Sequence, residues 1–224
     1  MIMGLYVCEN VLSGGFMMFK KLFLGAAIMA SFVFSMVVSA QGIVGSAHDF
    51  SGAGWNTTGE ICIVCHTPHN ADLTVTDSPL WNHQVTTSTF TLYSSSTLNA
   101  TPGQPDGRSK LCLSCHDGTV ALDSFGGVTT GTNYITGNAN FGTDLSNDHP
   151  ISITYDTALA TTDGGLHDPA TTNSGLGSTI ANDMLFSNKV ECSSCHEVHN
   201  AYGINKLLIK SNAGSQLCLT CHNK

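Results

Sequence analysis

The sequence predicts a small mixed fold made mostly of irregular loops, with short helices and few short strands. Only 8% of the 224 residues are aromatic, whereas glycine contributes 23, so a large core of packed side chains is not expected. Residues 124–147 contain 16 Gly, Ser, Thr or Asn in 24 positions, a composition that disfavours long helices. A disordered linker is the alternative there, but we expect ordered loops. Short strands are expected at 85–93 and 151–155, where threonine alternates with apolar residues.

The N-terminal residues 1–40 are predicted to be an extension followed by a cleaved signal peptide. Lys20 and Lys21 precede an apolar run over 22–38, and Val38-Ser39-Ala40 offers a small-residue cleavage site. A retained membrane helix is the alternative, but the run is short for a span. We therefore expect a mature chain of 41–224 without a membrane span, secreted to the cell surface, the extracellular space or the periplasm.

The charge of the chain excludes nucleic acid as its main partner. Eight Lys and Arg against 16 Asp and Glu give a formal net charge of −8, which cannot form a basic face. Nine cysteines and ten histidines are instead a surplus of metal and cofactor ligands. Cys8 is assigned no function, because translation from Met17 or Met18 would remove it.

The other eight cysteines all lie in four C-x-x-C-H segments, the attachment pattern of c-type haem. Two thiols three positions apart can bond the two vinyl groups of one porphyrin, and the adjacent histidine reaches the iron as its proximal ligand. A zinc ribbon would need pairs closer together, since these begin 50, 80 and 26 residues apart. A disulfide framework would not place histidine after every pair. The sequence predicts four covalent haems c, attached through Cys62, Cys65, Cys112, Cys115, Cys192, Cys195, Cys218 and Cys221, with His66, His116, His196 and His222 as proximal ligands.

The four segments form an internal repeat. A C-H-x-x-H-N segment, at 65–70 and at 195–200, is each time followed by an L-C-L-x-C-H segment, at 111–116 and at 217–222. We therefore expect two duplicated dihaem units within one tetrahaem domain, at about 41–125 and 126–224. The porphyrins themselves would replace much of the missing core.

Six histidines remain as candidate distal ligands for four irons. His167 lies in a loop rich in Gly and Asp and is predicted to be a bystander. Without His167, five candidates remain for four irons. This leaves two possibilities open: one candidate is idle, or one binds a haem of a neighbouring chain. The five candidates are His48, His69, His83, His149 and His199.

The chain resembles the doubled C-x-x-C-H multihaem cytochromes over nearly all of 43–224. Besides the haem segments, the matching stretches are Ser46-Ala47-His48-Asp49-Phe50, Thr67-Pro68-His69-Asn70, Pro79-Leu80-Trp81-Asn82-His83, Asp117-Gly118-Thr119 and Asp148-His149-Pro150-Ile151. Within that family, the chain is similar to the OmcE-type cytochromes in its length and in its four haem segments. That resemblance implies stacked haems with two histidine ligands each, polymerisation into conductive filaments, and one distal histidine donated between subunits, with His69 the preferred candidate.

These observations predict an electron carrier rather than an enzyme. An iron bound by two imidazoles has no open position for a substrate. The expected partners are other copies of the chain and redox partner cytochromes. Two alternatives remain: a monomeric periplasmic tetrahaem shuttle, and a multihaem reductase, which would need one five-coordinate iron.

Overall fold

The structure, a computed structural model, describes residues 42–223; the predicted signal peptide, its cleavage site and Cys8 lie outside the described residues. The predicted fold class is confirmed, because loops join short helices and a single pair of two-residue strands in this range. The helices are α2 (Gly107–His116), α3 (Thr157–Asp163), α4 (Ile180–Met184) and α5 (Cys218–Cys221), the strands are β1 (Ile153–Thr154) and β2 (Lys189–Val190), and 3-10 turns lie at η1 (Gly137–Ala139), η2 (Cys192–Ser194), η3 (Asn205–Leu207) and η4 (Ala213–Ser215).

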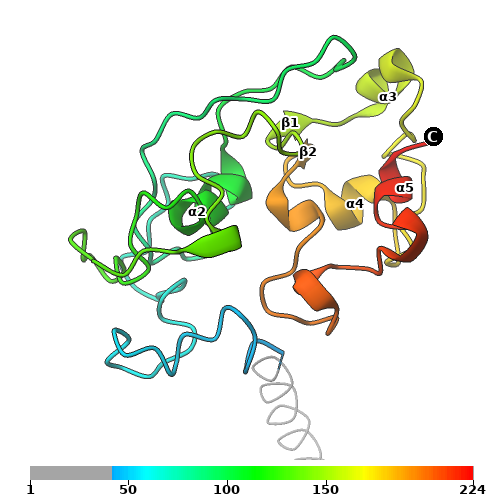
Figure 1. Cartoon of the computed structure of the whole chain (residues 1–224). Helices are drawn as coiled ribbons and strands as arrows, with labels where there is room; N and C mark the ends of the chain where they lie inside the picture. The colour runs from blue at the N-terminus through cyan, green and yellow to red at the C-terminus, as the bar shows by residue number, and fades with distance from the viewer. Residues whose placement is uncertain (1–41, 224) are drawn as a thin grey trace, which may run out of the picture. The chain divides into compact units, whose positions relative to one another are not determined.

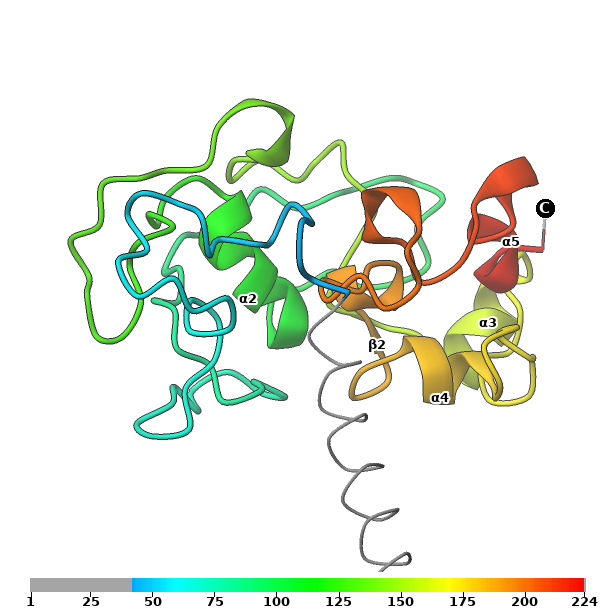
Figure 2. The same ribbon diagram turned by 90° about the horizontal axis from the view of Figure 1, so that it is seen from below.

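Local capping sets where the short helices begin and end. The Asp156 carboxylate accepts a hydrogen bond of 2.8 Å from the Leu159 N–H and so begins α3. Gly164, at φ 68°, ends α3 in the left-handed conformation that favours glycine. Figure 1 and Figure 2 both show α2 on one side of the described chain and α3, α4 and α5 grouped on the other, with the β1–β2 ladder between them.

The strand expected at 151–155 is confirmed, and the one expected at 85–93 is wrong. Ile153 pairs with Val190 in the antiparallel β1–β2 ladder. Within residues 85–93 the ladder is limited to an isolated parallel bridge between Thr91 and Asp144. Phe90 pairs with a side chain instead: its N–H donates to Gln104 Oε1 at 2.8 Å, and the Gln104 amide donates back to the Phe90 carbonyl at 2.9 Å. A local alternation of threonine cannot distinguish these two kinds of partner.

The polar stretch 124–147 forms ordered loops, as predicted. The Asp123 carboxylate accepts hydrogen bonds from the N–H groups of Thr132 and Asn133. The Leu122 N–H donates to the Asn133 carbonyl at 2.7 Å. The loop therefore folds back on its own start rather than acting as a linker.

The side-chain core of the described residues is divided into two small clusters. One joins Phe90, Leu113 and Leu145. The larger one contains the buried residues Tyr155, Ala160, Ile180, Met184, Leu185, Ile209 and Leu217. No helix within residues 42–223 combines the length and apolar character that a bilayer crossing requires.

Met184, 1% exposed in the larger cluster, gives a test of this packing. We expect Met184→Ala to lower the free energy of unfolding by about 2–5 kcal/mol, because it removes contacts and leaves a cavity. Leu73→Ala is the matched control: Leu73 is 73% exposed, so a change within about 0.5 kcal/mol is expected. Chemical denaturation of both haem-loaded variants measures the difference, and equal effects would contradict the assigned core.

Candidate functional site

Each C-x-x-C-H segment forms a single tight turn. Site one (62–66), site three (192–196) and site four (218–222) each close with a bond from the histidine N–H to the carbonyl of the first cysteine, 2.9–3.0 Å long. Site two (112–116) ends helix α2. Helical turns carry sites two to four, in α2, η2 and α5, while site one is a hydrogen-bonded turn.

A short extended segment lies beside three of the four turns and repeats the same backbone pairing. The residue after the attachment histidine donates to a carbonyl of this segment, and the N–H two residues later donates back to the second cysteine. The pairs are Thr67 to Leu80 and Asn82 to Cys65, Glu197 to Leu207 and Ile209 to Cys195, and Asn223 to Gly165 and His167 to Cys221, all between 2.7 and 3.0 Å. The sequence did not predict these pairings, because the paired residues lie up to 58 positions apart in the chain.

These flanking residues also orient the attachment histidines. The Nδ1 atom of His66 donates to the Pro79 carbonyl at 2.6 Å. His116 Nδ1 donates to the Ala139 carbonyl at 2.7 Å, and His196 Nδ1 donates to Lys206 at 2.9 Å. A carbonyl acceptor places the proton on Nδ1, so the lone pair on Nε2 stays free to bind a metal. This is the arrangement found at metal-bound histidines.

Three predicted distal histidines each lie opposite an attachment histidine. The ring centres of His48 and His116 are 6.0 Å apart, those of His66 and His199 are 6.1 Å apart, and those of His149 and His222 are 6.3 Å apart. One metal–nitrogen bond of about 2 Å to each ring would separate two ring centres by about 6 Å. The three spacings therefore fit an iron bound between each pair.

His48 is also electrostatically suited to bind iron. Its Nδ1 atom is buried and has no hydrogen-bond partner among residues 42–223. Burial, and then the nearby His116, lower the pKa of His48 to about 4. The ring is therefore neutral at physiological pH, which is the form that binds metals.

The remaining predicted ligands are placed differently. His69 is exposed, and neither it nor His196 has an imidazole ring opposite it within the described part of the chain. His83 is 2% exposed, with Nδ1 2.9 Å from the Gln84 carbonyl and Nε2 3.0 Å from the Ala121 carbonyl. His167, the predicted bystander, donates its backbone N–H to Cys221.

The cysteines of successive sites approach each other in chain order. Burial, and then the nearby Cys65 of site one, raise the pKa of Cys115 in site two to about 12. The neighbouring Cys192 of site three, together with burial, raises the pKa of Cys112 in site two. Burial, and then the neighbouring Cys218 of site four, raise the pKa of Cys195 in site three. Sites one to four therefore form a continuous series in space.

The residues present fit covalent haem better than a thiolate metal centre. No group of three or more His, Cys, Asp or Glu able to hold a metal ion occurs in the described range. Burial is the main cause that raises the pKa of Cys65 to about 11, which indicates largely apolar surroundings for this thiol. Apolar side chains are also exposed beside the turns, as a flat porphyrin surface requires: Leu80 is 53%, Phe141 51%, Val198 36% and Leu219 44% exposed.

Comparison with known proteins supports this assignment for the C-terminal pair of sites. The family described as "doubled CXXCH motif" matches residues 185–224, which contain sites three and four. No curated protein matches the chain. The family match indicates a multihaem c-type cytochrome, a class of electron-transfer proteins that carry covalently bound haem c and are typically extracytoplasmic.

Proposed function

We propose that the chain is an extracytoplasmic tetrahaem cytochrome that passes electrons along four haems c, each bound by two histidines. The three imidazole pairs, with ring centres 6.0–6.3 Å apart, are the observation that carries this proposal. Haem supplies reversible one-electron chemistry, and the cysteines and histidines of the turns would hold it. With two histidines holding each iron, no coordination position would remain for a substrate, so the proposed role is that of a carrier rather than an enzyme.

Two signals support a location outside the cytoplasm. The predicted signal peptide at 20–40 would direct export, and covalent attachment would retain haem in a compartment where free thiols are oxidised. The terminal partners of such a carrier are other redox proteins that deliver or accept single electrons.

We further propose that copies of the chain join into a conductive filament at the cell surface. The exposed rings of His69 and His196 support this, because each lacks an imidazole opposite it among residues 42–223. The pair His66 and His199 joins the first C-H-x-x-H segment to the second within one chain. The reciprocal pair, His69 of one copy with His196 of the next, would continue the haem series from copy to copy. A monomeric periplasmic shuttle is the second candidate.

Size and microscopy together test the filament. Size-exclusion chromatography and electron microscopy of the purified haem protein are expected to show polymers for the wild-type chain and monomers for His69→Ala. His167→Ala is the matched control and should still polymerise. A wild-type chain that remains monomeric would favour the shuttle and contradict the filament, while leaving the tetrahaem assignment intact.

A further inference from the structure

A buried carboxylate lies where the second and third attachment turns meet. Glu191 directly precedes Cys192 and is 2% exposed. Its Oε2 atom accepts a hydrogen bond of 2.9 Å from the Ser109 N–H on α2 and one of 3.2 Å from the Ser152 hydroxyl. All of these partners are donors, so the bonds favour the ionised carboxylate, although burial is the larger influence and raises the pKa of Glu191.

A second set of bonds joins the same two segments in the reverse direction. The Cys192 N–H donates to Ser109 Oγ at 2.9 Å, and Ser109 is 0% exposed. The Ser194 hydroxyl accepts from the Glu191 N–H at 2.9 Å, within the capping box that begins η2. Ser109 lies one helical turn before Cys112, so this reciprocal connection holds α2 against η2 where the second and third attachment turns meet.

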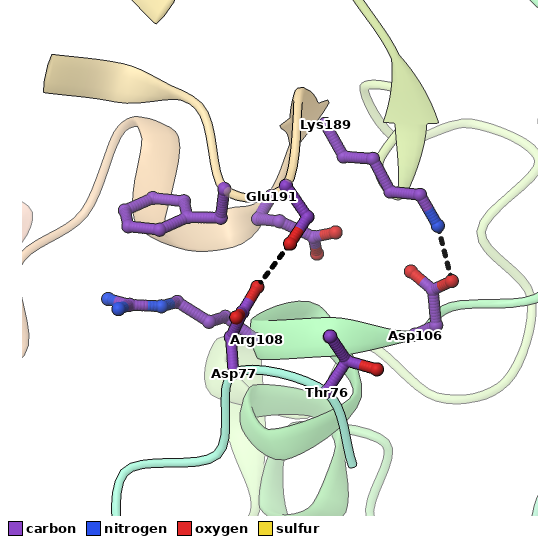
Figure 3. Close-up of a pocket in the computed structure, with 9 residues that line it drawn as sticks. Thr76, Asp77, Asp106, Arg108, Lys189 and Glu191 are labelled. Atoms are coloured by element: carbon purple, nitrogen blue, oxygen red, sulfur yellow. Dashed lines mark hydrogen bonds and ion pairs between the residues drawn. The ribbon is translucent and has the colours of Figure 1, made fainter. Parts of the chain in front are cut away.

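Nearby cations do not neutralise Glu191 through an ion pair in the described structure. Lys189 pairs with Asp106 instead, and the Arg108 guanidinium lies 3.9 Å from the centre of the Phe186 ring. Figure 3 shows Glu191 between the Arg108 side chain and the Lys189–Asp106 ion pair. A buried carboxylate without a paired cation keeps a strong field, because the low-dielectric surroundings screen it weakly.

We propose that Glu191 is the positioning residue for electron transfer between the two dihaem halves, holding the second and third haem attachments together and lowering the reduction potentials of both haems. The inference rests on the proposed tetrahaem function. The chemistry that the haems would supply is the exchange of one electron, with one iron passing from ferrous to ferric and its neighbour from ferric to ferrous, and with no bond or proton transferred. The negative charge of Glu191 would favour the ferric state of each neighbouring haem, which is the more positive one.

Glu191→Gln tests the charge in the haem-loaded chain. The amide keeps the shape of the side chain but removes its charge, so spectroelectrochemical titration is expected to show higher midpoint potentials for two of the four haems. Glu60→Gln is the matched control, because Glu60 is exposed and lies two residues before Cys62; water and salt screen its charge, and all four potentials should stay unchanged.

Ser109→Ala tests the positioning separately, because it removes the acceptor of the Cys192 N–H and leaves the carboxylate in place. After laser-flash photoreduction, electrons are expected to equilibrate several-fold more slowly between the halves of Ser109→Ala. Its midpoint potentials should not show the rise expected for Glu191→Gln.

Wild-type potentials in a Glu191→Gln chain that holds four haems would overturn the inference, and so would a wild-type equilibration rate in Ser109→Ala. If Glu191→Gln does not load four haems, the electron equilibration rate measured in Ser109→Ala decides whether the inference holds. A wild-type chain without four haems would instead refute the proposed function itself.

Discussion

Replacing His48 with alanine is expected to convert one of the four haems from a low-spin to a high-spin state. The ring of His48 lies 6.0 Å from that of His116 and is the only imidazole opposite it in the described structure. Without His48, His116 would be the only histidine left to bind the iron of site two, which favours a five-coordinate iron. Electron paramagnetic resonance of the oxidised protein measures this directly, as a new high-spin signal beside three retained low-spin haems.

Two histidine variants make this result specific. His167→Ala removes an imidazole predicted to be a bystander, so all four haems should stay low-spin. His83→Ala should also leave them low-spin, because both ring nitrogens of His83 lie against backbone carbonyls. A high-spin haem in His83→Ala, together with a fully low-spin His48→Ala, would show that the pairing by ring distance is incorrect.

Without haem, the chain is expected to lose most of its ordered structure. Its two core clusters are small, and large apolar residues are exposed beside the attachment turns. Porphyrin burial and iron–histidine bonds would supply the missing stabilisation, as in other domains whose folding is coupled to ligand binding. Circular dichroism and amide hydrogen exchange of a chain produced without haem insertion should show little protection compared with the haem-loaded chain.

A variant that lacks one of the four haem attachment sites provides the control for that experiment. Replacing Cys218 and Cys221 with alanine removes one attachment and should unfold mainly the C-terminal part, where α5 and Leu217 contact the larger core cluster. Native-like amide protection throughout the haem-free chain would contradict haem as the main source of apolar contact.

The parts of the site that depend on local spacing could be predicted from the sequence. The C-x-x-C-H segments, the short turns that carry them and the loop-rich fold all follow from residues close together in the chain. The pairing of His48 with His116 and of His66 with His199 could not be predicted, because it depends on how distant loops fold together.

Long-range polar contacts were likewise not visible in the sequence. Glu191 precedes a haem segment but gains its importance from Ser109, 82 residues earlier. The extended segment around Leu80 was noted for its match to a known pattern, yet its backbone pairing with the first attachment turn follows from the fold alone. The strand predicted at 85–93 is wrong for the same reason, since the Gln104 side chain pairs with Phe90 and the backbone pairing is limited to a single bridge between Thr91 and Asp144.

We expect the chain to bind four haems covalently, each between two imidazoles. Intact-protein mass spectrometry of the exported chain under denaturing conditions tests this most directly, because only covalent haem remains attached. The mature chain should be heavier by four haem masses, with each haem attached to a peptide that contains one of the four C-x-x-C-H segments. A mass without four added haems, or cysteines recovered as free thiols or disulfides, would contradict it.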